Sequence, residues 1–273
     1  MGMELTDDQL AADRAIADWY NNRSRQIYVL SGLAGTGKTT LLRYTVCETL
    51  GLEPEKSVAF VTPTGKAATV LIRQGIPATT LHRLIYQAMT EESETIINGR
   101  PVTVEKLVFR RRESIDKAIK LIVLDEFSMV SDEVLADVAR FGVKMLVCGD
   151  GAQLPPVEGM NSFISSPDVT LKTIVRQQEG NPIIRLARDA MEGKYIPFGT
   201  YGDRAFVLSA RRLKGEYRKK YMLKADQMIC GLNKTRAKVN DEVRVYLGYG
   251  GLPQRGEKLI CTVNNWEQYI DGE

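Results

Sequence analysis

Short apolar runs alternate along the chain with longer stretches in which apolar residues recur every three or four positions. The short runs are nearly continuous, which is typical of parallel strands that are covered on both faces. The longer stretches have the period of helices that are apolar along one face. This alternation predicts an α/β fold built from βαβ units with right-handed crossovers.

The first expected helix is preceded by Thr6, whose hydroxyl group is the kind that an N-cap uses. Strands are expected at Gln26–Ser31, Ser57–Thr62, Lys120–Asp125, Lys144–Cys148, Ala205–Leu208, Gln227–Leu232 and Lys258–Val263. Helices are expected at Thr6–Asn21, Lys38–Leu50, Gly65–Arg73, Asp132–Phe141, Asn181–Glu192 and Thr235–Leu247.

Two stretches interrupt the alternation. Thr90–Ala118 is polar and charged, and its Asn98-Gly99-Arg100-Pro101 segment is a turn signal between two β-compatible runs. This stretch predicts a β-hairpin inserted into the first α/β unit. Leu154–Thr170 is rich in Pro, Gly, Ser and Asn, so we expect a first domain at 1–170 and a second at 171–273.

The composition is that of an ordinary globular protein, with 44% hydrophobic and 26% charged residues in a length of 273. The formal net charge of +3 does not by itself point to a nucleic-acid partner. No apolar run approaches the roughly 18 residues that a membrane span needs, and the N-terminus has no signal-peptide core. Cys47, Cys148, Cys230 and Cys261 form no CxxC pair, which argues against structural zinc. The chain is therefore expected to be cytoplasmic, with free thiols.

A phosphate-binding loop is indicated by residues 32–40, which contain the complete GxxxxGK[ST] pattern between an expected strand and an expected helix. Glycines let backbone N–H groups turn inward around phosphate oxygens, and the following helix N-terminus adds a favourable dipole. Lys38 is expected to reach the β- and γ-phosphates, and Thr39 to give its hydroxyl oxygen to Mg²⁺. The predicted nucleotide site comprises Gly32, Ala34, Gly35, Thr36, Gly37, Lys38, Thr39 and Thr40.

A second chemical feature is the acidic pair Asp125 and Glu126, which ends an apolar strand. A strand of this kind delivers Asp125 to the Mg²⁺ shell and Glu126 to the attacking water. The alternative for an acidic pair at a strand end is an ordinary solvated loop. The P-loop upstream favours nucleotide hydrolysis.

Further motifs follow in order. Thr62-Pro63-Thr64-Gly65-Lys66-Ala67-Ala68 comes after the second expected strand, and Thr79-Thr80-Leu81-His82 after a short linker. Asp125-Glu126-Phe127-Ser128-Met129 and Gly149-Asp150-Gly151-Ala152-Gln153-Leu154-Pro155-Pro156-Val157 complete the series. With the P-loop, these segments resemble motifs I, Ia, Ib, II and III of superfamily 1 helicases, especially the RecD/Dda branch. The likeness continues through Val175-Arg176-Gln177, Asn181-Pro182-Ile183 and Asn233-Lys234-Thr235, and so covers nearly the whole chain.

The resemblance implies tandem RecA-like P-loop NTPase domains with parallel sheets. It implies an ATP hydrolase and DNA helicase that moves 5′ to 3′ on single-stranded DNA and unwinds duplexes. ATP and Mg²⁺ are the implied cofactors, and single-stranded and tailed duplex DNA are the implied partners. DNA replication, recombination and repair are the implied settings.

The resemblance also assigns roles at the nucleotide. Gln9 matches the glutamine that reads the adenine edge, and Gln153 matches the residue that senses the γ-phosphate. Arg176 matches an arginine finger that stabilises charge on the transferring phosphoryl group. The alternatives are an exposed polar residue for Gln9 and a surface arginine for Arg176.

DNA contacts are implied at Pro63, Thr64, His82 and Asn233, with hydroxyl and backbone N–H groups binding phosphate. For His82, the only histidine, a buried and hydrogen-bonded side chain is the alternative. The hairpin occupies the place of this family's strand-separating pin. Phe109 is either a base-stacking wedge in that pin or an anchor that holds the hairpin to its domain.

The chain departs from the family after Val263, where an inserted β-barrel and a last arginine motif have no counterpart. We therefore expect a truncated or split helicase with a partial second RecA-like domain at 171–273 and slow hydrolysis on its own. The alternative function is an ATP-gated module that binds single-stranded DNA without unwinding. A small-molecule kinase would leave Gln153 and the Pro63-Thr64 motif unexplained.

Overall fold

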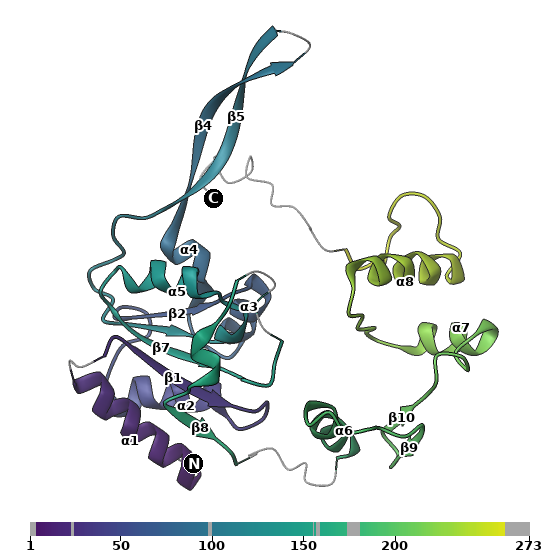
Figure 1. Cartoon of the computed structure of the whole chain (residues 1–273), viewed down its shortest axis with the longest axis horizontal. Helices are drawn as coiled ribbons and strands as arrows, with labels where there is room; N and C mark the ends of the chain where they lie inside the picture. The colour runs from purple at the N-terminus through teal and green to yellow at the C-terminus, as the bar shows by residue number, and fades with distance from the viewer. Residues whose placement is uncertain are drawn as a thin grey trace. The chain divides into compact units, whose positions relative to one another are not determined.

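A computed structural model describes residues 4–22, 25–97, 100–154, 156, 159–173 and 181–259 (Figure 1). The chain divides into two compact units, Met1–Glu179 and Gly180–Glu273, and each is described by itself. In these described ranges, no helix is long and apolar enough to cross a membrane.

The first unit is built around a parallel sheet of six strands, in the order β3-β2-β6-β7-β1-β8. Its strands are β1 (Ile27–Gly32), β2 (Val58–Thr62), β3 (Ala78–Thr80), β6 (Leu121–Leu124), β7 (Lys144–Gly149) and β8 (Val169–Leu171). The order is that of a RecA-like P-loop fold, which confirms the expected fold class for the first unit. Because β7 pairs with both β1 and β6, the segment after β7 lies between the P-loop and the acidic pair.

Successive side chains of each strand point to opposite faces of this sheet. Both faces are therefore apolar, and helices cover each of them. The helical elements are α1 (Asp7–Asn21), α2 (Lys38–Tyr44), α3 (Gly65–Arg73), α4 (Leu81–Ile85) and α5 (Asp132–Ala139). Leu121 and Val123 pack in one core with α1, α2 and α3. Ile122 and Leu124 face the other core, with α4 and α5.

The start of α1 is fixed by hydrogen bonds on both sides. Thr6 and Gln9 form a reciprocal capping box, as the hydroxyl at Thr6 led us to expect. Asp8 accepts from the backbone N–H groups of Lys172 and Thr173, both at 2.9 Å. Burial acts to raise the pKa of Asp8, but these bonds and one from the Thr6 hydroxyl outweigh it and hold the pKa at about 2. The first turn of α1 is thereby tied to the chain that follows β8.

The expected helix Lys38–Leu50 divides into α2 and a π-helical turn, Thr45–Thr49. The buried carboxylate of Asp13 on α1 accepts hydrogen bonds from the Thr45 hydroxyl at 2.5 Å and from the Thr49 hydroxyl at 2.9 Å. The π-turn therefore directs both hydroxyl groups to one acceptor.

A long antiparallel hairpin is inserted between α4 and β6, as the polar stretch predicted. It consists of β4 (Tyr86–Ile97) and β5 (Arg100–Arg111), with Tyr86 opposite Arg111. The hairpin begins at Tyr86 rather than Thr90, since β4 continues directly from α4, and it ends at Arg111 rather than Ala118. Figure 1 shows the ribbon projecting away from the sheet of the first unit.

The second unit contains α6 (Pro182–Met191), β9 (Gly199–Tyr201), β10 (Ala205–Val207), α7 (Gly215–Lys224) and α8 (Asn233–Tyr246). Among residues 181–259, the sheet consists of β9 and β10, which are antiparallel. The strand expected at Gln227–Leu232 is wrong, because no strand within the described part of the chain pairs with it and Ile229 is 94% exposed. The last expected strand, Lys258–Val263, falls mostly outside the described residues.

Candidate active site

The P-loop connects β1 to α2 at the carboxyl end of the sheet. Gly35 and Gly37 have φ values of 88° and 77°, a left-handed conformation that side chains other than glycine rarely adopt. A Cβ atom on Gly32 would lie 2.8 Å from Thr36 Oγ1 and 3.1 Å from Leu171 Cβ. The glycines of the pattern are thus required by the shape of the turn and by its packing against β8.

Lys38 begins α2 with its ammonium group turned back into the loop. Lys38 Nζ donates to Gly32 O at 2.7 Å and to Leu33 O at 3.0 Å. Thr36 is fully buried, and its hydroxyl donates to Leu33 O at 2.9 Å. The charged group that the pattern predicts is therefore held at the mouth of the loop, while Thr40 lies exposed on the first turn of α2.

Thr39 and the acidic pair come together as predicted. Thr39 Oγ1 donates to Asp125 Oδ2 at 3.1 Å, and Asp125 Oδ1 accepts from Glu126 N at 2.9 Å. Glu126 has φ 58°, and among the described residues it alone has a positive φ without being glycine. Such a conformation is costly and is found mainly where a functional side chain must be aimed.

Burial raises the pKa of both carboxyl groups of the acidic pair, Asp125 and Glu126. Desolvation raises the pKa of Asp125, against the hydrogen bonds from Glu126 N and the Thr39 hydroxyl. Desolvation and the neighbouring Asp125 charge raise the pKa of Glu126. A carboxylate with a raised pKa is a stronger proton acceptor, which suits a general base.

Asp150 is a site residue that the sequence did not single out. It is 5% exposed, its Oδ2 accepts from Ala34 N of the P-loop at 3.1 Å, and its Oδ1 accepts from Ala152 N at 3.0 Å. Asp150 therefore joins the P-loop to the segment that carries Gln153. Its position directly after the apolar strand β7, like that of Asp125 after β6, was the signal available.

Gln9 is buried at 4% exposure, so it is not the exposed polar residue offered as the alternative. Its Nε2 donates to Thr36 O at 2.9 Å, and its Oε1 accepts from Thr6 N at 3.0 Å. The amide nitrogen can donate twice and the amide oxygen can accept twice, and each of them makes one hydrogen bond here. The structure thus places Gln9 against the P-loop and leaves the adenine contact as a prediction.

Gln153 is exposed and lies between two sites. Its side chain approaches the Glu126 carboxyl group and acts to lower the pKa of Glu126, against the larger effect of burial. It also lines a groove of about 740 Å³ at the carboxyl ends of β2, β6 and β7, which we call the carboxyl-edge groove. The groove is lined by Pro63, Thr64, Leu81, His82, Met129, Val130, Ser131, Val134, Gln153, Leu154 and Pro156.

The groove gathers three of the residues expected to contact DNA. Pro63 and Thr64 enter it from the end of β2, where the Thr64 hydroxyl oxygen caps α3 by accepting from Ala67 N at 3.3 Å. That leaves the Thr64 O–H as a donor. His82 is exposed on α4, so it is not the buried histidine offered as the alternative, and its ring lies 5.4 Å from that of Tyr86.

The remaining predicted residues belong to other parts of the chain. Phe109 lies on β5 and is 53% exposed. Asn233 is exposed at the first turn of α8, in the second unit. Arg176 lies outside the described residues.

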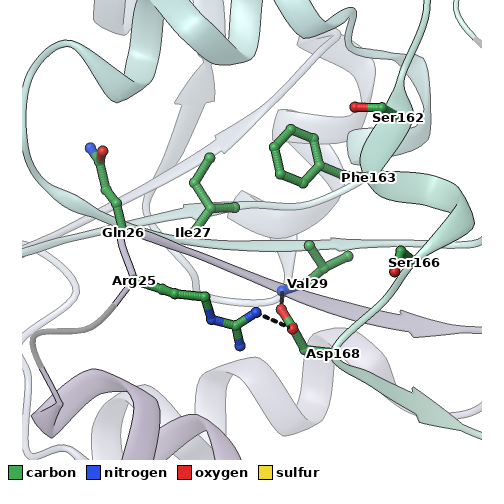
Figure 2. Close-up of a pocket in the computed structure, with 8 residues that line it drawn as sticks. All are labelled: Arg25, Gln26, Ile27, Val29, Ser162, Phe163, Ser166 and Asp168. Atoms are coloured by element: carbon green, nitrogen blue, oxygen red, sulfur yellow. Dashed lines mark hydrogen bonds and ion pairs between the residues drawn. The ribbon is translucent and has the colours of Figure 1, made fainter.

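A cavity of about 540 Å³ lies at the opposite end of β1 (Figure 2). There the Arg25 guanidinium group pairs with Asp168 at 2.6 Å, and Asp168 also accepts from Val29 N at 2.8 Å. Phe163 and Ile27 contribute apolar surface to the same cavity. Since it adjoins the amino end of β1, this cavity is separate from the P-loop.

The profile of a family described as "AAA domain" matches residues 4–212. The chain is 27% identical over 205 residues to the ATP-dependent DNA helicase dda of Enterobacteria phage T4, covering 70% of this chain and 44% of that protein. It is 27% identical over 217 residues to the ATP-dependent DNA helicase PIF1 of Candida albicans, covering 67% of this chain and 22% of that protein. A crystal structure of Bacteroides Pif1 bound to ssDNA covers 88% of this chain and 56% of its own, at 20% identity and a TM-score of 0.49. The chain spans less than half the length of either curated relative.

Proposed function

Because the chain belongs to the AAA domain family and is similar to superfamily 1 helicases of the Dda and PIF1 type, we propose that it is an ATP-driven motor that separates duplex DNA. We propose that it moves 5′ to 3′ on single-stranded DNA, as the likeness of its motifs to the RecD/Dda branch implies. The observation that carries the proposal is the position of Gln153. Its side chain lines the carboxyl-edge groove and also influences the pKa of the general-base candidate Glu126.

The chemistry of the donors fits Mg·ATP. A threonine hydroxyl and a carboxylate, at Thr39 and Asp125, are hard oxygen ligands of the kind that Mg²⁺ prefers. Within the described part of the chain, no three His, Cys, Asp or Glu side chains gather to hold an ion alone. That suits Mg²⁺, which is usually bound by one or two carboxylates together with phosphates. When bound, Mg²⁺ neutralises charge on the β- and γ-phosphates.

The residues of the chain then divide the work of hydrolysis. Lys38 exchanges its bonds to the P-loop carbonyls for phosphate oxygens, and backbone N–H groups of the loop bind the rest. Glu126 takes a proton from the attacking water. In this proposal Arg176 supplies the positive charge of the arginine finger, and Gln153 reports the state of the γ-phosphate to the groove.

The carboxyl-edge groove is proposed to bind single-stranded DNA. Its apolar lining, with Met129 50% and Leu154 85% exposed, is suited to base faces. The Thr64 hydroxyl and the His82 ring provide polar contacts for the backbone. This division of apolar and hydroxyl contacts is consistent with a net charge of only +3.

The test begins with the variants Lys38→Ala and Glu126→Gln. Lys38→Ala should abolish ATP turnover and leave much of the binding of an oligothymidylate, measured by fluorescence anisotropy. Glu126→Gln should bind a fluorescent ATP analogue and hydrolyse ATP at least about a hundredfold more slowly. Lys56→Ala, which removes an exposed ion pair with Glu53 in the loop before β2, is the matched control. If Lys38→Ala still hydrolysed ATP at the wild-type rate, the assignment of the P-loop as the phosphate-binding site would be refuted.

The second test distinguishes the motor from the module that only binds. The wild-type chain is offered ATP with duplexes that carry a 5′ tail, a 3′ tail or no tail. Opening of the 5′-tailed duplex alone supports the proposed activity and direction. Opening of the 3′-tailed duplex contradicts the direction, and ATP-dependent binding without displacement favours the ATP-gated module.

A further inference from the structure

The root of the hairpin converges on one carboxylate, that of Asp137 on α5. Tyr86, the first residue of β4, donates its hydroxyl hydrogen to Asp137 Oδ2 at 2.7 Å. Arg111, the last residue of β5, has its Nε 3.8 Å from Asp137 Oδ1. Tyr86 and Arg111 are partners in the hairpin register, so Asp137 contacts both strands at the same level.

The hydrogen bond between Tyr86 and Asp137 is partly buried. The Asp137 side chain is 27% exposed. Burial, and after it the hydrogen bond and charge of Asp137, raise the pKa of Tyr86 to about 12. The phenol therefore remains a donor at every physiological pH. Arg140, the C-cap residue of α5, also approaches Asp137 Oδ1, at 3.6 Å, and does not belong to the hairpin.

A two-stranded ribbon has little stability of its own, so its direction depends on what holds its base. The backbone closes the base, since Arg112 N donates to Ile85 O at 2.8 Å and Ile85 is fully buried. These contacts fix where the ribbon starts. Tyr86, Arg111 and Asp137 provide the first side-chain contacts that fix where it points.

The same tyrosine connects the ribbon to the groove. The Tyr86 ring lies 5.4 Å from the ring of His82, at an interplanar angle of 40°. His82 lines the carboxyl-edge groove, and Val134, one turn before Asp137 on α5, lines it too. The groove and the ribbon root therefore share α4 and α5 as a common support.

We propose that Asp137 is a positioning residue for strand separation, because it holds both strands of the hairpin root in a fixed direction relative to the groove. The inference rests on the proposed function. In a motor that draws one strand through the groove, the ribbon must stay fixed against the force of the duplex. Asp137 supplies that resistance without contacting ATP or the groove.

The experiment compares Asp137→Ala and Tyr86→Phe with Arg140→Ala, which removes a partner of the same carboxylate that lies outside the hairpin. The readouts are the rate of displacement from a tailed duplex, and the kcat and half-saturating DNA concentration of ATPase activity with single-stranded DNA. Asp137→Ala and Tyr86→Phe should slow displacement by about tenfold and leave both ATPase parameters within about twofold. Arg140→Ala should leave all three unchanged. Asp137→Asn, whose amide oxygen still accepts from Tyr86, should fall between wild type and Asp137→Ala.

Displacement that is unchanged in Asp137→Ala, or ATPase activity that falls in parallel with it, overturns the inference. Amide hydrogen exchange of residues 86–92 and 108–111 gives a readout that does not need unwinding. Exchange should rise in Asp137→Ala and stay at the wild-type rate in Arg140→Ala. If the wild-type chain opens no duplex, the proposed function fails, and exchange alone then decides whether Asp137 positions the hairpin.

Discussion

Replacing Asp150 with asparagine is the most direct test of how the P-loop is held. The carboxylate is 5% exposed and accepts two backbone N–H groups, from Ala34 at 3.1 Å and from Ala152 at 3.0 Å. An asparagine keeps one carbonyl oxygen, so it can accept from one of the two. Its amide nitrogen is a donor and cannot accept from the other.

The magnitude follows from the bond that is lost. A hydrogen bond to a charged group contributes about 1.5–3 kcal/mol, and a buried N–H group without a partner costs a similar amount. We take about 2 kcal/mol as the loss. If ATP binding becomes weaker by that free energy, KM for ATP rises by about thirtyfold. The Asp150 charge is only one of the influences that raise the pKa of Glu126, behind burial and the Asp125 charge, so kcat should fall much less than KM rises.

The assay is steady-state ATPase activity with saturating single-stranded DNA, together with thermal unfolding. Asp168→Asn is the matched control, because Asp168 also accepts a backbone N–H group of β1, at the end remote from the P-loop (Figure 2). It should lower Tm and leave KM for ATP unchanged. A KM within about twofold of wild type in Asp150→Asn would refute the reasoning, as would an equal rise in both variants.

Three further predictions concern stability. Gly149→Ala would place a Cβ atom 2.6 Å from a ring carbon of Phe127, which should cost about 1–3 kcal/mol and lower Tm. Lys144→Met removes an ammonium group that donates to three carbonyl oxygens in the last turn of α1 and just after it, and should reduce the free energy of urea unfolding by about 2 kcal/mol. Asp8 has a folded pKa of about 2 against an ordinary 3.8, so its carboxylate stabilises the fold above pH 3.8. Asp8→Asn should lose about 1 kcal/mol at pH 7, since the group is partly exposed, and the loss should disappear as pH falls towards 2.

Matched variants separate these effects from general damage. Gly65→Ala adds a Cβ that meets nothing within 4 Å, and Lys120→Met alters an exposed lysine beside the start of β6. Asp7→Asn changes an exposed carboxylate next to Asp8. Gly65→Ala is the control for Gly149→Ala, Lys120→Met for Lys144→Met, and Asp7→Asn for Asp8→Asn. A control that loses as much stability as the variant it is matched to would contradict that prediction. For Asp8→Asn, a loss that is independent of pH would do so as well.

The central strands could be predicted from the sequence because burial on both faces leaves a continuous apolar run, as at Lys120–Asp125. The edge strands could not. Ala78–Thr80 and Val169–Leu171 pair on one side only and carry no such run. Gln227–Leu232 has the run but finds no strand to pair with among the described residues, so pattern alone predicted a strand that is absent.

The geometry of the P-loop was predictable because its residues are close in sequence and their spacing reflects the turn. Asp150 was missed because its partner, Ala34 N, is a backbone atom 116 residues away. A backbone N–H group is present in almost every residue, so the sequence pattern does not reveal which carboxylate will bind it. Asp137 was missed for a related reason, since Tyr86 and Asp137 meet only when α5 packs beside the hairpin root. In each case, the fold rather than the motif creates the contact.

The hairpin enters and leaves the sheet domain at one point, because Ile85 and Arg112 are joined by a backbone hydrogen bond. The strand pairing in the six-stranded sheet is therefore independent of the length of the hairpin. The hairpin could be shortened or lengthened as a unit. Twelve residues in each strand give a reach of about 40 Å. Removing two residues from each strand keeps every remaining side chain on its face and shortens the reach by about 7 Å. The length of the hairpin can therefore be altered without disturbing the P-loop and the acidic pair.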